Sequence, residues 1–255
     1  MYAEERRIKI IAVLSKDKTV DVNKLAHTFG VSGATIRSDL HNLERTGILT
    51  RTHGGAIEAT KTGFESDMGN RAAEHLAAKQ KIARSALAQI EEGATIALDT
   101  GTTTLELARC LFQRRRLTVV TNDILIARVL ETATGVQTIL LGGVIRKGFH
   151  CTVGPGTTDP AAAAKLTVDK AFMAANSFAL ANGATTPDIQ QAEAKKRLMA
   201  MSSKIFLLCD KSKFGKVSFA QFARVNDIHV LITDFMSGAD CRSCKKRGLQ
   251  VIVAS

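Results

Sequence analysis

The sequence contains no long apolar run. None of its hydrophobic stretches approaches the roughly 18 residues that a membrane-spanning helix requires. The first residues, MYAEERRIKII, are charged and lack the apolar region of a signal peptide. These absences predict a soluble cytoplasmic protein without a membrane partner. With 255 residues, of which 45% are hydrophobic, the chain is long enough for one large α/β domain and a small one.

The cysteines lack the pattern of a disulfide framework or a metal site. Their number, five, is odd, which argues against a disulfide scaffold. Cys241 and Cys244 form CRSC, with metal or redox spacing, but a zinc site needs two more ligands in a second compact cluster, and the sequence has none. We therefore expect unpaired reduced thiols, no metal and no cofactor.

The charge is positive but unevenly spread. Net charge is +11, which suggests an anionic partner. Residues 1–60 hold nine Lys/Arg and seven Asp/Glu, a net of +2, so the rest of the chain carries +9. A DNA-binding function must therefore depend on local geometry and not on bulk charge.

The first thirty residues predict two helices that end in a tight turn. A short extended stretch, TVDV, separates them. Asn23 is expected to cap the second helix, and Gly30 to end it in a left-handed conformation. The expected inner faces are Ile8, Ile11 and Leu14 in the first helix and Leu25, Ala26 and Phe29 in the second. With the helix that follows, this predicts a helix-turn-helix motif at about residues 20–39.

The next helix is expected to run from a Ser32 cap to Gly47. Its apolar stripe is narrow, with Ile36, Leu40 and Leu43 on one side. The opposite side carries Ala34, Arg37, Ser38, His41 and Arg45. A solvated helix would show the same polarity, but small residues near the helix start also let it approach bases in a major groove.

A hairpin directly after this helix favours the DNA-binding interpretation. It comprises a strand at 48–51, a Gly54-Gly55 turn and a return through Ala56-Ile57. Such a hairpin is a wing, which contacts phosphates or the minor groove. The candidate DNA-contacting residues are Ser32, Gly33, Ala34, Thr35, Arg37, Ser38, His41, Arg51 and His53.

The string TIRSDLHNLERTGILTRTHGGA resembles the winged helix-turn-helix of DeoR-type bacterial transcription regulators, whose usual pattern is TIRRDL…LE…G…R.HGGA. Ser38 stands where the family commonly has a second Arg, which removes one positive charge from the exposed face. The resemblance implies a winged DNA-binding domain at residues 1–58.

Residues 59–74 lack apolar periodicity over most of their length and predict a linker. In residues 75–255 apolar strands alternate with helical patterns, which predicts a mostly parallel sheet with helices on both faces. The fold class is therefore α/β, with a small winged helix-turn-helix domain before a larger sheet domain. The expected strands are ATIALD, LTVVTN, VQTILLGG, DKAFMAA, KIFLLCD, DIHVLITD and LQVIVA.

Several of these strands end in polar or Gly-rich clusters, where open α/β sheets bind ligands. DTGTTT precedes the helical run LELARCL, so its backbone N–H groups and hydroxyls suit a phosphate. It is not a Walker loop, and a Thr-rich turn is also a common helix cap. Arg114–Arg116 are expected to be plain surface charge. The candidate effector-binding residues are Asp99, Thr100, Gly101, Thr102, Thr103, Thr104, Asn122, Gly142, Gly143, Asp210 and Lys213.

The DeoR resemblance continues through K-Q-K-I-A, LDTGTTT, VVTN, LLGG, D-K-A-F, E-A-K-K-R-L-M and DKSKFG…ITD. It implies an effector domain related to sugar-phosphate isomerases, with a phosphorylated sugar as inducer. One departure is AANSFAL at 174–180, where members often have a Gly-rich acidic string such as G-x-D-G-I.

Three functions are compatible with these features. The first is a repressor of a sugar-metabolism operon that acts as a homodimer or homotetramer on double-stranded operator DNA. The second is a sugar-phosphate isomerase-like enzyme with an accessory DNA-binding domain, but the sequence shows no paired acid and base of that kind. The third, a constitutive architectural DNA-binding protein, leaves the large domain unexplained. We therefore expect a regulator and not an enzyme.

Overall fold

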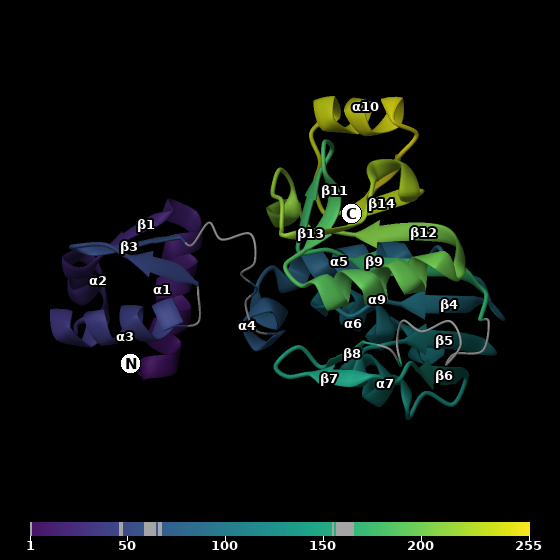
Figure 1. Ribbon diagram of the computed structural model, residues 1–255, viewed down its shortest axis with the longest axis horizontal. Coiled ribbons are helices and arrows are strands. Elements are labelled where there is room, and N and C mark those ends of the chain that lie inside the picture. Colours follow the sequence, from purple (N-terminus) through teal and green to yellow (C-terminus); the bar gives the residue numbers. More distant parts are fainter. Residues whose placement is uncertain (1, 46–47, 59–64, 66–67, 155, 157–165) are drawn as a thin grey trace. The chain divides into compact units, whose positions relative to one another are not determined.

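The computed structural model describes residues 2–45, 48–58, 65, 68–154, 156 and 166–255. The chain divides into two compact units, residues 1–66 and 67–255. Each unit has its own helices and strands (Figure 1) and its own apolar core.

The described residues of the small unit form three helices and a three-stranded antiparallel sheet, which is the predicted winged helix-turn-helix architecture. The sheet has the order β1-β3-β2. The expected wing is confirmed as β2 and β3, and β1 adds a third strand alongside β3. The elements are α1 (Ala3–Asp17), β1 (Thr19–Asp21), α2 (Val22–Phe29), α3 (Gly33–Arg45), β2 (Leu49–Arg51) and β3 (Gly55–Glu58).

Two details of the first helices differ from the sequence-based expectation. Ile8 is 57% exposed and Ile10 is fully buried, because the inner face of α1 follows Ile10 and Leu14. The cap of α2 is Asp21 and not Asn23, since the Asp21 carboxylate accepts a hydrogen bond from the Lys24 N–H at 2.9 Å. The Gly30 stop is confirmed by its positive φ of 63°. The expected stop at Gly47 lies outside the described residues.

The large unit is built on a seven-stranded parallel sheet of order β15-β14-β12-β9-β4-β5-β6. All seven predicted strands form it, so the expected fold class is confirmed. The chain places β4, β5 and β6 in sequence outward from the middle and then returns to β9 on the other side of β4. The strands are β4 (Thr95–Leu98), β5 (Leu117–Thr121), β6 (Val136–Leu140), β9 (Val168–Ala174), β12 (Ser202–Leu208), β14 (Val230–Thr233) and β15 (Gln250–Val253).

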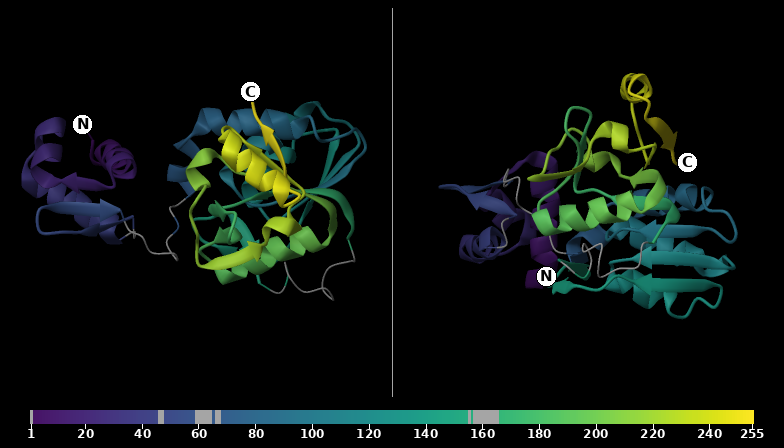
Figure 2. Two further views of the ribbon diagram at one scale, coloured as in Figure 1. Left: turned by 90° about the horizontal axis from the view of Figure 1, so that it is seen from above. Right: turned by 45° about the vertical axis from the view of Figure 1, so that its right-hand side comes forward.

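Helices cover both faces of this sheet, and each face has its own apolar core. One core contains residues from α5 (Leu76–Leu87), α6 (Thr102–Cys110) and α7 (Ile124–Leu130). The other contains residues from α9 (Ile189–Ala200) and α10 (Gly238–Lys246). The left view of Figure 2 shows α5 and α9 on opposite sides of the strands. The strand interiors alternate between the two cores, as a doubly covered parallel sheet requires.

Three features of the large unit were not expected from the sequence. The first is a hairpin of β7 (Val144–Arg146) and β8 (Cys151–Val153). The second is a small antiparallel sheet of β10 (Ser177–Ala179), β11 (Gly183–Thr186) and β13 (Ala220–Ala223), which includes part of AANSFAL. The third is α4 (Met68–Ala73), a helix that packs against α6 within the stretch expected to be a linker.

Three single-turn 3-10 helices complete the described elements of the large unit. They are η1 (Leu111–Gln113), η2 (Lys211–Lys213) and η3 (Val225–Asp227). The second of these follows β12 directly, so it places its lysines at the carboxyl end of the sheet.

Candidate DNA-reading surface and effector pocket

Helix α3 is fixed by a narrow apolar stripe and one buried ion pair. Ile36, Leu40 and Leu43 are all buried, as expected. The Asp39 carboxylate lies 2.5 Å from the Arg6 guanidinium of α1, and both side chains are less than a tenth exposed. This pair, 33 residues apart in the sequence, ties α3 to α1 and was not predicted.

The opposite face of α3 is exposed. Ala34, Arg37, Ser38 and His41 all lie on it, as the sequence indicated. The Ser32 hydroxyl caps the helix by accepting a hydrogen bond from the Thr35 N–H at 3.1 Å, which confirms the predicted cap. These small and basic side chains surround the helix start, where a helix in a major groove contacts base edges.

The wing depends on a close backbone approach. A Cβ atom at Gly55 would lie 1.8 Å from the Val20 carbonyl oxygen, so only glycine lets β3 run beside β1 at this point. Arg51 is tied to α3, since its backbone N–H donates to the Glu44 carboxylate at 3.0 Å. His53 is exposed at the turn. Both predicted wing residues are therefore on the same hairpin.

In the large unit, a pocket lies at the carboxyl ends of β9 and β12, beside the first turn of α6. From β4 the chain adds β5 and β6 toward one edge of the sheet, and from β9 it later adds strands toward the other edge. The pocket therefore adjoins the topological switch point of the sheet, between β4 and β9. Gly101 is required here, since a Cβ atom at this position would lie 2.5 Å from the Ala174 Cβ. The pocket is lined by Arg71, Lys79, Thr102, Thr103, Ala174, Ala175, Leu208, Cys209, Asp210 and Lys213.

The electrostatics of this pocket favour an anion. Thr102 and Thr103 are the first residues of α6, where backbone N–H groups have no intrahelical acceptor. Burial, followed by the nearby charge of Lys213, lowers the pKa of Lys79 to about 8. Burial alone would raise the pKa of Asp210, but Lys213 and the hydrogen bond from Ser212 outweigh it and lower that pKa. Three basic residues, Arg71, Lys79 and Lys213, therefore line the pocket with one carboxylate, Asp210, at a helix N-terminus.

Behind the pocket lies a network of buried polar side chains. Asp99 is fully buried and forms an ion pair with the Lys195 ammonium of α9. Burial raises the pKa of the Asp99 carboxyl, while Lys195 opposes this shift. The Thr100 hydroxyl donates to Asp123 at 2.7 Å. These residues hold the loop between β4 and α6 in place.

The structure brings some of the predicted effector residues together and separates others. Thr102, Thr103, Asp210 and Lys213 line the pocket. Asp99, Thr100 and Asn122 lie in the buried layer behind it, with the Asn122 amide donating to the Thr152 carbonyl at 3.0 Å. Thr104, Gly142 and Gly143 do not line the pocket. The Thr104 hydroxyl donates to the Gly101 carbonyl, and the two glycines lie on the exposed turn after β6.

Four charged residues of this region were missed by the sequence reasoning. Lys79 and Arg71 line the pocket, whereas Lys195 and Asp123 are buried in the supporting layer. The only signal for Lys79 and Lys195 was their place in K-Q-K-I-A and E-A-K-K-R-L-M. A helix lysine has the same sequence pattern whether it is solvated or buried.

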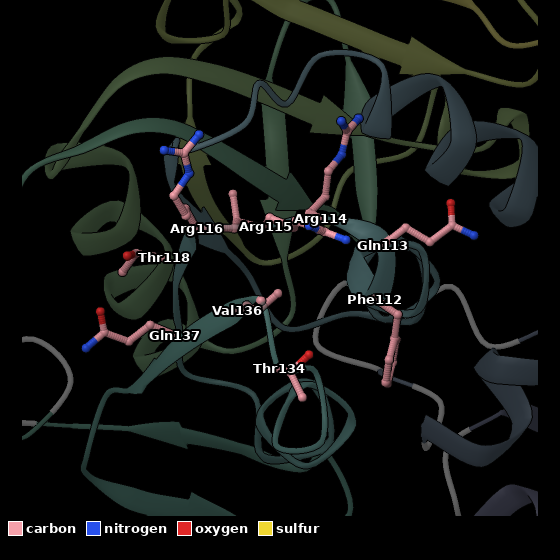
Figure 3. Close-up of a pocket in the computed structure, with 11 residues that line it drawn as sticks. Phe112, Gln113, Arg114, Arg115, Arg116, Thr118, Thr134, Val136 and Gln137 are labelled. Atoms are coloured by element: carbon pink, nitrogen blue, oxygen red, sulfur yellow. The ribbon is translucent and has the colours of Figure 1, made fainter.

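A second hollow lies at the amino ends of β5 and β6, opposite the switch point. Figure 3 shows that Arg114 and Arg116 extend to one side of the chain while Phe112 points to the other. The Arg114 guanidinium forms an ion pair with the Glu92 carboxylate at 3.6 Å. The side chains do not converge on a common point, which agrees with the expectation of surface charge.

All five cysteines are free. Within the part of the chain that the structure describes, no three or more His, Cys, Asp or Glu side chains form a group that could hold a metal ion. Over the same residues, no helix has the length and apolar character needed to cross a membrane.

Comparison with known proteins identifies both units. Residues 6–62 match the model of the DeoR-like helix-turn-helix domain, and residues 74–235 match the DeoR C terminal sensor domain. The chain belongs to the DeoR family of transcriptional regulators. The sequence-based identification of the family is thus confirmed.

Relatives in the DeoR family resemble this chain over almost its whole length. The HTH-type transcriptional regulator GlpR of Haloferax volcanii is 34% identical, with 95% of this chain and 94% of GlpR covered. The putative aga operon transcriptional repressor of Escherichia coli O157:H7 is 31% identical, with 98% and 93% covered. The transcriptional repressor AccR of Agrobacterium fabrum is 32% identical, with 91% and 89% covered. These names favour a regulator over an enzyme.

Among solved structures, ribose 5-phosphate isomerase A of Methanocaldococcus jannaschii matches with a TM-score of 0.40 and 18% identity, over 53% of each chain. The eIF2B delta subunit of Chaetomium thermophilum matches with a TM-score of 0.45 and 20% identity, over 65% of this chain and 58% of that one.

Proposed function

We propose that this DeoR-family regulator is a repressor of a sugar-metabolism operon and that a phosphorylated sugar releases it from operator DNA. The observation that carries the proposal is the cationic pocket at the switch point. Lys79, Lys213 and the first turn of α6 converge there from three different elements. A phosphate group would be held by charge-assisted hydrogen bonds at such a place.

The sugar part of the ligand would lie toward Ala174 and Ala175. These two residues end β9 and line the pocket, and they begin the AANSFAL segment in which this chain departs from the usual family string. Both side chains are buried and line the pocket together with Thr102 and Thr103. We infer that this departure selects a different sugar from that of members with the acidic string.

The small unit would read the operator. Arg37 and His41 lie exposed on α3 beside the small residues Ala34 and Ser38, so that face can enter a major groove. The names of two relatives, a putative aga operon repressor and the repressor AccR, support repression as the mode of action.

The repressor would act as a homodimer or homotetramer. Residues 1–60 carry a net charge of only +2, so one small unit would hold DNA weakly. Two units on a two-fold operator would combine their affinities. Residues 59–74 would transmit the effector signal by changing the spacing of the two readers.

Gel-shift titration of the full chain on its operator tests this function. We expect one or more phosphorylated sugars to release the DNA, while the same sugars without phosphate do not. Release by no phosphorylated sugar in a broad panel would argue for the architectural alternative. Conversion of the sugar during the assay would argue for the isomerase.

A further inference from the structure

Lys79 of α5 links the effector pocket to the helix that precedes it. The side chain is only 3% exposed. Its ammonium group donates hydrogen bonds to the backbone carbonyls of Arg71 and Glu74. Arg71 lies in the last turn of α4 and Glu74 follows the helix directly, so Lys79 satisfies carbonyls that the end of a helix leaves without an intrahelical donor.

Lys79 also lines the pocket, together with Thr102 and Lys213. An ammonium group has three N–H donors. Two of them are taken by the carbonyls at the end of α4, so one remains for a ligand in the pocket. Helix α4 is thereby connected through a single nitrogen atom to the place where we propose that the phosphate binds.

We propose that Lys79 is a positioning residue through which an anion in the pocket holds α4 against the large unit. This inference rests on the proposed function, because it assumes that the pocket binds an anion. An anion that accepts from the third N–H of Lys79 holds the ammonium group in the position from which it donates to both carbonyls. Anion binding therefore strengthens the cap of α4. By linkage, docking of α4 must strengthen anion binding by the same factor.

Docking of α4 determines how much free chain joins the two units. Residues 68–74 lie between the DNA-reading unit and α5, and they count as part of the large unit only while α4 is docked. Seven residues in extended form span at most about 25 Å. Undocking would therefore add at most about 25 Å to the reach of the connection, compared with the spacing of about 34 Å between two half-sites one turn of DNA apart.

Hydrogen exchange of the full-length protein, with inorganic phosphate as the probe, tests this inference. Two substitutions are compared with the wild type. Lys79→Met keeps the aliphatic stem but removes all three donors. Lys81→Met changes an exposed lysine on the same helix and serves as the matched control. Calorimetry measures phosphate binding in each protein, and circular dichroism checks the fold.

In the wild type and in Lys81→Met, we expect phosphate to slow exchange of the amides of residues 70–76 by at least about fivefold, the lower end of usual coupling factors. In Lys79→Met these amides should exchange fast, and phosphate bound by Lys213 and α6 should not slow them. A residue that only stabilises the fold would change the exchange rate but not its response to phosphate.

Lys213→Met separates the two roles of the pocket. It leaves the cap of α4 intact, so the amides of residues 70–76 should exchange as fast as in the wild type when no phosphate is present. A higher phosphate concentration should be needed to slow their exchange by the same factor. If phosphate binds the wild type but does not slow amide exchange of residues 70–76, the proposed role of Lys79 is wrong, while the anion pocket still stands. Slowing of equal size in a folded Lys79→Met would overturn the same role. Absence of phosphate binding to the wild type would overturn the anion pocket and with it this inference.

Discussion

Replacement of Lys195 by Met should strongly destabilise the large unit. The Lys195 ammonium is the cationic partner of the Asp99 carboxylate, and both side chains are at most 2% exposed. Asp99 Oδ1 has no hydrogen-bond donor among the described residues, and Oδ2 keeps only the Ala174 N–H at 2.9 Å once Lys195 is gone. Removing one partner of a buried pair leaves an uncompensated charge, which costs about 3–5 kcal/mol.

The loss should depend on pH because Asp99 can take up a proton. Burial already raises its pKa above the ordinary 3.8 in the wild type, and Lys195 opposes this rise. In Lys195→Met the folded protein therefore binds a proton more tightly than the unfolded chain does. Its free energy of unfolding should fall as pH rises from about 4 towards the raised pKa. The destabilisation should thus be smaller at pH 4.5 than at pH 7.

Urea denaturation followed by far-UV circular dichroism measures this effect, since the chain contains no tryptophan. Lys196→Met is the matched control, because Lys196 pairs with Glu193 on the exposed side of the same helix. That substitution should cost less than about 1 kcal/mol. The double variant Asp99→Asn/Lys195→Met should recover most of the loss. Equal stabilities of Lys195→Met and Lys196→Met would refute the reasoning.

Three further outcomes follow from the two sites. Arg37→Ala should weaken operator binding by about 1–3 kcal/mol at constant salt without changing the circular dichroism spectrum, and unchanged affinity would contradict the placement of α3. A fragment of residues 1–66 should bind operator far more weakly than the full chain in the same gel shift. Phosphate affinity measured by calorimetry should fall as pH rises through about 8, where Lys79 loses its proton, and should fall less in Lys79→Met.

Much of the fold followed from local patterns in the sequence. The seven strands of the large sheet are continuous apolar runs, and the stripe of Ile36, Leu40 and Leu43 has helical spacing. The helix start at Thr102 and Thr103 was found because strand ends and helix starts are visible in the sequence. Each of these signals extends over a few neighbouring residues.

The parts that could not be predicted depend on contacts between distant residues. Asp39 meets Arg6 across 33 positions, and Lys195 meets Asp99 across 96. In each pair the basic residue lies on a helix whose sequence also suits a solvated surface. The antiparallel sheet of β10, β11 and β13 was missed because its short strands, SFA, GATT and AQFA, contain no continuous apolar run. Only the packed fold shows which charges are buried.

The central claim is that a phosphorylated sugar at the first turn of α6 releases the repressor from DNA. Gel-shift titration of operator complexes of the wild type and Thr102→Asp with the releasing sugar tests it most directly, because the added carboxylate would occupy the place of the phosphate beside Lys79 and Lys213. We predict that the wild type dissociates and that Thr102→Asp stays bound at every sugar concentration. Dissociation of both proteins at the same concentration would contradict the account.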